Sequence, residues 1–356
     1  MSLRTPWLRI TVVVLGAAGA VAIIWWRGPA WSDFANTFSK VEWRWVVSAI
    51  LLNLLSVIAR SMAWKTVIDQ AVPAPRPGYR IVFAGFSVGL FANAVLPGRI
   101  GELARVAVLN RRMSPRRGLW ATLVGTVFAH RVFDLPPVLL LIAFVVSTAK
   151  IPHWAATSLV VVVVVGLGLM AFAFASARHH HRSRLDGLGA VRRLVEMARY
   201  GLAVMKTPWA AGKAVFFQTV GWTFQLLAVW TAMRAYDIHE GIPAAATVLL
   251  LMNVATIVPL WPGNFGLVQA AVALPLKRYG VSYAQGFAFG IGLQLIEASV
   301  GVGVGLLFLA REGLSFAMLK RMPDAAQAEV PGEEEDDAGN GSAGEPERRL
   351  VGGRRR

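Results

Sequence analysis

Six long apolar runs constrain this chain more than any other feature. A helix needs about 20 apolar residues to cross the hydrocarbon core of a bilayer, because it rises only about 1.5 Å per residue. The sequence contains six runs near that length, at residues 7–26, 43–64, 119–147, 154–177, 213–233 and 284–310. Tryptophans cluster at the run ends, as they do at membrane interfaces. The runs predict an all-α polytopic membrane protein with six spanning helices.

The composition agrees with this fold class and excludes two soluble domains, which 356 residues could otherwise form. Charged residues make up 16% of the chain, against roughly 25% in soluble domains. The chain contains no cysteine, so disulfides, thiol nucleophiles and Cys-ligated metal sites are excluded. The first run follows Arg4 and Arg9, which is compatible with a cleaved signal peptide. Because the run continues to Trp26, we favour an uncleaved anchor.

Two further apolar stretches, residues 80–110 and 244–280, are interrupted by proline and glycine. The interrupting residues are Pro97, Gly98 and Gly101 in the first stretch and Pro262, Gly263 and Gly266 in the second. Proline removes a backbone donor and glycine permits unusual dihedrals, so each helix must open there. Open backbone at membrane depth is tolerated only inside protein or beside a water-filled cavity. Each arm is also short for a span, so we predict two re-entrant helical hairpins.

The basic residues predict the orientation of the chain in the membrane. The net charge of +16 could indicate nucleic acid as a partner. If both hairpins are re-entrant and the N-terminus is cytoplasmic, 23 of the 31 basic residues before residue 322 lie at the cytoplasmic side and seven at the other. This asymmetry predicts a multi-pass inner (cell) membrane protein with both termini cytoplasmic. The basic loops are then expected to meet anionic lipid rather than nucleic acid.

The order of the elements predicts an internal repeat. Residues 43–153 and 213–312 each contain a span, a broken stretch and a second span. One span separates the two units, so they face opposite ways, as in alternating-access transporters; the alternative is that Pro-Gly pairs recur by chance. The other segments are predicted to be an N-terminal anchor with an outer loop (1–42), a connecting span with a basic amphipathic cytoplasmic helix (154–212) and a disordered charged tail (313–356).

Three motifs resemble a known family. They are NAVLPGRIGELAR at residues 93–105, HRVFD at 130–134 and PGNFG at 262–266. With these motifs, residues 40–312 resemble the transmembrane, flippase-like domain of lysylphosphatidylglycerol synthases. The resemblance implies a domain that moves aminoacylated phospholipid between leaflets and is often fused to a soluble aminoacyl-transferase domain. Only a short, mostly polar segment follows the last span here, so we do not expect lysinylation of lipid by this chain.

The first break carries three charged residues, Arg99, Glu102 and Arg105. A charge at the bilayer centre costs about 2.5–3.5 kcal/mol on insertion scales, so it pairs or faces a cavity. Glu102 and Arg105 are three residues apart and share a helix face. One interpretation is a lipid headgroup site in which an arginine binds phosphate and Glu102 binds ammonium. The other is an internal Glu–Arg pair that braces the hairpin.

A second polar group lies within the third span. His130, Arg131 and Asp134 are spaced so that one helix face holds all three. They could bind a headgroup or relay a proton, or form a buried pair that locks this span to the first break. Pro136 and Pro137 follow and predict a kink.

The second unit offers Asn264, Gln294 and Glu297 as counterparts. We expect Glu297 to meet the cavity or Arg131; the alternative is a lone interhelical hydrogen bond. The repeats Gly286-x-x-x-Gly290 and Gly301-x-x-x-Gly305 predict close helix packing.

No cofactor or metal is expected. Residues 179–181 are three histidines, but their basic surroundings favour a loop at the lipid surface. No nucleotide-binding or hydrolase motif occurs in the sequence. The sequence therefore predicts a lipid flippase that binds a phospholipid headgroup in a polar mid-membrane cavity and is not an enzyme. Two alternatives stay open, a lipid-binding scaffold for a separately encoded lipid-modifying enzyme and a membrane enzyme acting on a lipid-linked substrate. Homo-oligomers are also left open.

Overall fold

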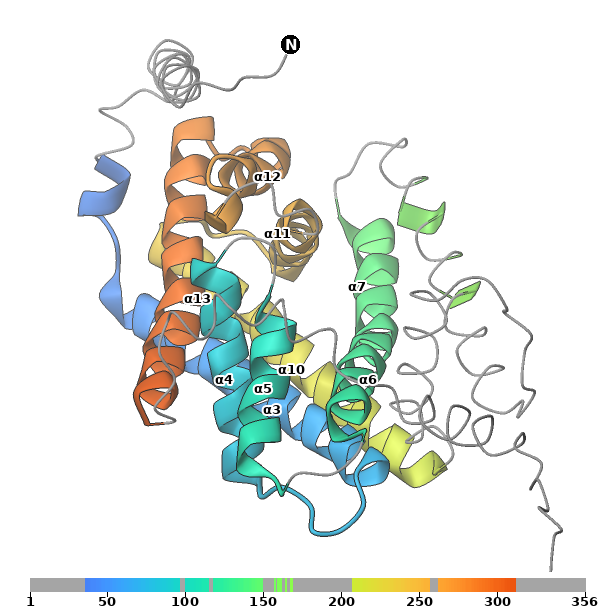
Figure 1. Ribbon diagram of the computed structural model, residues 1–356. Coiled ribbons are helices and arrows are strands. Elements are labelled where there is room, and N and C mark those ends of the chain that lie inside the picture. Colours follow the sequence, from blue (N-terminus) through green and yellow to red (C-terminus); the bar gives the residue numbers. More distant parts are fainter. Residues whose placement is uncertain are drawn as a thin grey trace, which may run out of the picture.

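The computed structural model describes residues 36–96, 100–114, 118–149, 207–256 and 262–311, with seven isolated positions between 157 and 168 (Figure 1). Several predictions from the sequence fall outside these residues. They concern the first span, most of the 154–177 span, the amphipathic segment, the three histidines, the charged tail, and Pro97, Gly98 and Arg99. Within the described residues every regular element is a helix, as predicted.

The helices form two sets along the chain. The first set comprises α3 (Trp43–Ala71), α4 (Tyr79–Val95), α5 (Gly101–Arg112), α6 (Leu119–Val132) and α7 (Leu135–Thr148). The second comprises α10 (Pro208–Ala235), α11 (Ile242–Ala255), the 3₁₀ turn η3 (Pro262–Asn264), α12 (Leu267–Leu276), the turn η4 (Lys277–Tyr279) and α13 (Tyr283–Arg311). Helix α3 continues seven residues past the predicted end of its span. Arg60 lies inside this helix, within the predicted span, although the count of basic residues had assigned it to the cytoplasmic side.

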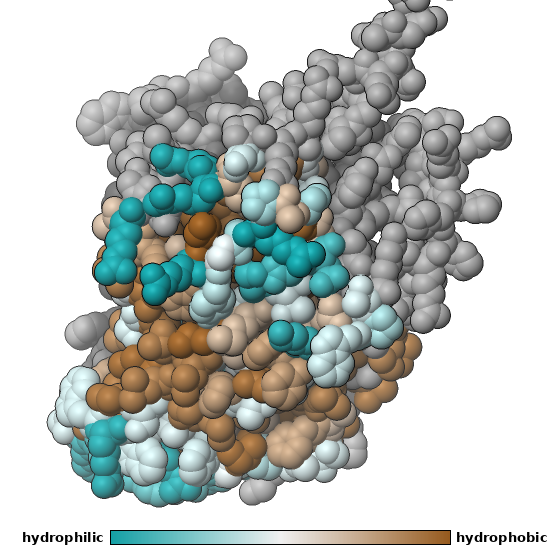
Figure 2. All heavy atoms as spheres, turned by 90° about the horizontal axis from the view of Figure 1, so that it is seen from below, coloured by the Kyte–Doolittle hydropathy of each residue, from teal (hydrophilic) through white to brown (hydrophobic). Residues whose placement is uncertain are grey.

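Three described helical segments are long and apolar enough to cross a membrane. They are α3, the joined α6 and α7 (Leu119–Thr148), and α13. Helix α10 has 28 residues but is not among them. The outer side of α3 exposes Trp43, Val47, Leu51 and Leu55, each four residues from the next, which is one continuous helix stripe. Figure 2 shows a broad band of apolar side chains beside a group of hydrophilic ones.

Helices α3 and α10 run antiparallel along their whole length. At one end the Glu42 backbone N–H donates to the Ala235 carbonyl at 3.0 Å. At the other end the Thr207 hydroxyl donates to the Gln70 side chain at 3.4 Å. Midway, Gly221 lies against Arg60, so that an added Cβ would come within 2.5 Å of the Arg60 side chain. The first helix of each set therefore points in the opposite direction to its counterpart.

Both Pro-Gly breaks end a helix, as the sequence predicts. Helix α4 ends at Val95 and α11 at Ala255. In the first hairpin Gly85 faces Leu109 while Gly89 faces Gly101, so α4 and α5 are antiparallel and closely packed. In the second break Gly263 and Gly266 have φ angles of 69° and 89°, which side chains other than glycine rarely adopt.

The two sets of helices make similar packing contacts when α4 is matched with α11, α5 with α12, and the α6–α7 pair with α13. Helix α4 packs on α13, and its counterpart α11 packs on α7. Helix α5 packs on α6, and α12 packs on α13. The glycine repeats provide close approach, as predicted, because Gly286 and Gly290 lie against α12 while Gly301 and Gly305 lie against α4.

The third run is divided into two helices. Helix α6 ends at Val132 and α7 begins at Leu135. Pro136 and Pro137 occupy the first turn of α7, where a missing backbone donor costs least. The predicted kink therefore lies at the start of α7, and Asp134 lies at the junction.

The close contact in the first hairpin predicts the effect of Gly101→Ala. The added Cβ would lie 2.6 Å from the Asn93 carboxamide and against the Gly89 carbonyl oxygen, which is backbone and cannot rotate away. We expect the free energy of unfolding in detergent to fall by about 1–3 kcal/mol. Gly78→Ala is the matched control, because nothing lies within 4 Å of its added Cβ. Equal unfolding midpoints for the two variants would contradict this packing.

Candidate functional site

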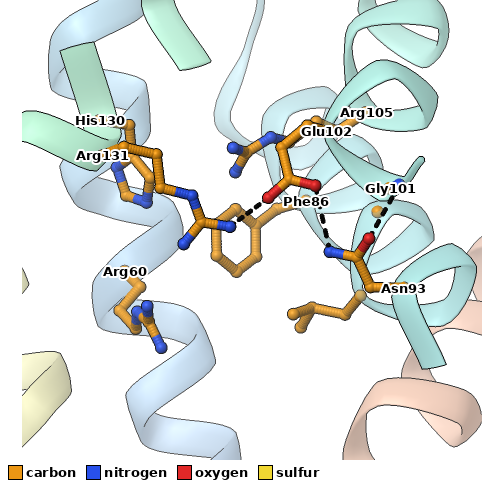
Figure 3. A pocket seen from close by; sticks show the side chains of 10 residues that line it. Arg60, Phe86, Asn93, Gly101, Glu102, Arg105, His130 and Arg131 are labelled. Carbon is orange, nitrogen blue, oxygen red and sulfur yellow. Dashed lines mark hydrogen bonds and ion pairs between the residues drawn. The ribbon is translucent and has the colours of Figure 1, made fainter. Parts of the chain in front are cut away.

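A polar cavity of about 50 Å³ lies between the first hairpin and helices α3 and α6. Figure 3 shows its side chains converging on Phe86 from both sides. The lining residues are Arg60, Phe86, Gly89, Leu90, Asn93, Gly101, Glu102, Arg105, His130 and Arg131. Three of the ten are arginines, which is unusual inside an apolar helix bundle.

The tip of the first hairpin is held by Asn93, in the last turn of α4. Its carbonyl oxygen accepts the backbone N–H of Gly101 at 2.9 Å. Its amide nitrogen donates to Glu102 Oε2 at 3.3 Å (Figure 3). One side chain therefore satisfies a free N–H group at the start of α5 and fixes the Glu102 carboxylate.

Arg131 joins this hairpin to the α6–α7 pair. Its guanidinium donates to the Glu102 carboxylate and, at 3.3 Å, to Asp134 Oδ2. The side chain is 46% exposed, the highest value among these ion-paired groups of the site. Arg131 thus lies at the mouth of the cavity and bridges two helix elements.

Asp134 is the centre of the polar network. Besides Arg131, it accepts hydrogen bonds from Arg60 Nη2 at 3.3 Å and Trp222 Nε1 at 3.0 Å, and from the Gln218 amide. Asp134 is buried. A buried carboxylate is tolerated only where such donors replace the water it has lost. The donors come from α3, α6 and α10, so Asp134 ties the two sets of helices together.

The network continues from Arg60 into the last helix. Arg60 Nη1 donates to Gln225 Oε1 at 3.3 Å, and Gln225 Nε2 donates to Glu297 Oε1 at 3.3 Å. Among the described residues, Glu297 is therefore connected to the cavity through Gln225 and Arg60, and not through Arg131 as one expectation had it. Glu297, which was predicted as a second-unit counterpart of the first polar group, is connected to the first unit by a continuous chain of polar side chains.

Arg105 does not pair with Glu102, although the two share a helix face. Its guanidinium lies over the Trp64 ring, 4.9 Å from the centroid, and 5.7 Å from the centroid of Phe86. Trp64 is fully buried and its indole N–H donates to Thr126 at 3.1 Å. His130 packs edge-on against Phe86. Two aromatic faces therefore position the Arg105 cation at the cavity wall.

The remaining second-unit residues brace the second hairpin. Asn264 donates to the Ala255 carbonyl at 2.9 Å, across the break. Gln294 accepts from Gln269 at 2.6 Å and donates to the Gly263 carbonyl. Neither residue lines the cavity. Among the described residues, Asn264, Gln269 and Gln294 form a cluster of their own, and the second unit meets the first through Gln218, Trp222 and Gln225 of α10.

Of the predicted site residues, Glu102, Arg105, His130 and Arg131 line the cavity, and Asp134 bonds to two of the lining arginines. Sequence reasoning missed Arg60, Gln218, Trp222 and Gln225. Two signals could have found them. Arg60 lies inside the predicted span 43–64, and the apolar pattern continues past it to Val67 and Ile68, so it is a charge within an apolar helix. Gln218, Trp222 and Gln225 lie at i, i+4 and i+7 on an otherwise apolar run.

The sequence of this chain is similar to that of known membrane proteins. The family model described as the lysylphosphatidylglycerol synthase TM region matches residues 7–305.

The chain belongs to this family.

UPF0104 membrane protein PH1989 of Pyrococcus horikoshii is 25% identical over 129 residues, which are 36% of this chain and 37% of the relative. The chain thus matches little more than a third of that relative's length. UPF0104 membrane protein MJ1078 of Methanocaldococcus jannaschii is 24% identical over 211 residues, which are 58% of this chain and 88% of the relative. No solved structure gives a significant match. Membership in the family shows an integral membrane protein with transmembrane helices.

Within the described residues no group of three or more histidines or carboxylates is placed to hold a metal ion. The chemistry of the site there is that of guanidinium groups, amides and two carboxylates. These groups bind polar ligands by hydrogen bonds and charge.

The central position of Asp134 predicts a large effect of Asp134→Ala on stability. Loss of the carboxylate leaves Arg60 and Arg131 without their shared partner, and breaking such a buried pair costs about 3–5 kcal/mol. Glu42→Gln is the control, because the Glu42–Arg44 pair is exposed and worth under about 1 kcal/mol. Denaturation of both variants in the same detergent measures the difference. A loss of similar small size in both would show that Asp134 does not hold the bundle together.

Proposed function

We propose that this protein is a lipid flippase, which binds the headgroup of a phospholipid in the polar cavity and carries it between leaflets. The observation that carries the proposal is the cluster of three arginines and two carboxylates around a cavity within an apolar bundle. Such charges are costly inside a membrane and occur there where a polar substrate passes.

The arrangement of the two helix sets supports transport rather than binding alone. The antiparallel α3–α10 pair and the mirrored packing are the arrangement expected of an inverted repeat. In transporters of that design, one repeat rocks against the other around a site near the midplane. Here Asp134, Arg60 and Gln225 would be the groups whose bonds change as the units move.

In the proposed topology, each helical hairpin enters the membrane and leaves it again on the same side. The exposed apolar stripe of α3 and the three candidate spans would face lipid. In the proposed orientation, both termini and the end of α5 are cytoplasmic, and the end of α10 is on the opposite side.

Labelling of single cysteines tests this topology, and the chain has no natural cysteine to interfere. Ser114 follows α5 and His239 follows α10, and both are exposed. The two positions lie near opposite ends of α3, because Leu109 clusters with Ile68 while Ala235 bonds to Glu42. We expect Ser114→Cys and His239→Cys to react with a membrane-impermeant maleimide from opposite sides of inverted and right-side-out vesicles. Labelling from the same side would overturn the re-entrant model.

Reconstitution into liposomes tests the transport itself. We expect the purified protein to move fluorescent phospholipid between leaflets at least about 10-fold faster than in empty vesicles. Glu102→Gln should lose most of this activity, since its weaker bond to Arg131 loosens the cavity mouth. Asp237→Asn is the control, because its side chain is exposed and far from the cavity. If wild type moves no lipid faster than empty vesicles, the proposed function is wrong.

A further inference from the structure

The cavity carries buried nitrogen atoms that have no hydrogen-bond partner among the described residues. Four buried nitrogen atoms on three of its lining residues are unpaired, namely Arg60 Nε, Arg105 Nε, Arg105 Nη2 and His130 Nδ1. Arg105 is 5% exposed and His130 1% exposed. An unpaired buried donor costs about 1–3 kcal/mol, and more where it is charged. Three of the four atoms are arginine N–H donors, and the imidazole nitrogen of His130 can donate or accept, so the cavity calls for a ligand rich in acceptors.

The carboxylates near the cavity are engaged with groups other than Arg105. Glu102 and Asp134 are both used internally, because Arg131 and Asn93 bind the first while Arg60 and the α10 side chains bind the second. Within the described residues no carboxylate lies within ion-pair distance of Arg105. Two carboxylates thus contact the lining guanidinium groups directly, and a third, Glu297, reaches Arg60 only through Gln225. Arg105 is the lining arginine that lacks a carboxylate partner among the described residues.

The aromatic rings keep Arg105 ready for an anion without satisfying its donors. Trp64 and Phe86 offer only their ring faces to the guanidinium, which stabilises the cation but accepts no N–H bond in its plane. The planar edge of an arginine fits two oxygens of one phosphate. An ammonium group would have to displace Arg131 or Asn93 from Glu102 and would then lie beside Arg105.

The size of the cavity limits which part of a lipid can enter. About 50 Å³ holds a few water molecules or one compact polar group. The acyl chains and the glycerol backbone must therefore stay outside, beyond the mouth at Arg131.

We propose that the cavity selects the anionic phosphate group of a lipid, bound by Arg105 with Arg60 and His130, and disfavours headgroups with net positive charge. This inference rests on the proposed function for the identity of the ligand as a lipid. The same donors could bind inorganic phosphate, so the two sources must be separated by experiment.

Titration calorimetry with soluble dihexanoyl lipids tests the selectivity on the full-length protein in detergent. We expect dihexanoyl phosphatidylglycerol and phosphatidic acid to bind at least about 10-fold more tightly than dihexanoyl phosphatidylcholine or lysyl-phosphatidylglycerol. Inorganic phosphate should bind more weakly than either anionic lipid. Equal binding of all four lipids would overturn the proposal, and so would inorganic phosphate binding as tightly as phosphatidylglycerol.

Variants of Arg105 assign the effect to this site. Arg105→Gln should weaken binding of phosphatidylglycerol by about 10- to 100-fold and abolish the preference over phosphatidylcholine. Arg105→Lys keeps the charge but loses the planar edge, so it should retain part of the preference. Arg44→Gln is the control, because Arg44 is exposed and paired with Glu42. If Arg105→Gln keeps the wild-type preference while remaining folded by circular dichroism, the proposal fails.

Failure of this inference is distinguishable from failure of the proposed function. A protein that moves fluorescent phosphatidylcholine and phosphatidylglycerol equally well in liposomes, and binds both alike, is a flippase without the proposed selectivity. A protein that binds anionic lipid through Arg105 but moves no lipid supports the selectivity and contradicts transport.

Discussion

The buried carboxylate of Asp134 is the interaction on which the rest of the structure depends. In an apolar bundle it cannot keep its water, so protein donors must surround it. Arg60 reaches it from α3, Arg131 from α6, and Gln218 with Trp222 from α10. These helices come from both halves of the chain. Satisfying one charge therefore fixes how the two helix sets meet, beside the cavity that the first hairpin forms with helices α3 and α6.

The same network connects the cavity mouth with the far helix. Arg131 binds Asp134 and Glu102, and Glu102 is held by Asn93 at the tip of the first hairpin. On the other side, Arg60 and Gln225 lead to Glu297 on α13. A ligand anion that competes for Arg131 or Arg60 would change bonds in both units at once. This is how a bound headgroup could be coupled to movement of one unit against the other.

Local patterns predicted the all-helical class and the positions of the breaks, while three of the six predicted spans are long and apolar enough to cross a membrane among the described residues. The prediction of the site depended on tertiary contacts. The Pro-Gly breaks and the Arg131–Asp134 spacing are local, so the hairpin ends and that ion pair could be predicted. For Glu102 the sequence left two partners open: Arg105 on its own helix face, or a residue of the third span in a pair that locks this span to the first break. Only the tertiary contact with Arg131, 29 residues away, decides between them. Arg60 was missed because it was counted with the basic residues of the cytoplasmic side, although it lies within the predicted span 43–64. Gln294 was expected near the cavity, but Gln269 and the Gly263 carbonyl satisfy it elsewhere.

The central claim is that a lipid headgroup enters the cavity between the first hairpin and helices α3 and α6. A cryo-electron microscopy structure in nanodiscs containing phosphatidylglycerol tests it most directly. The account predicts density for a phosphate within hydrogen-bond distance of Arg105, with its acyl chains leaving past Arg131. Lipid density confined to the outer apolar surface of the helices, with the cavity closed to lipid in every conformation resolved, would contradict it.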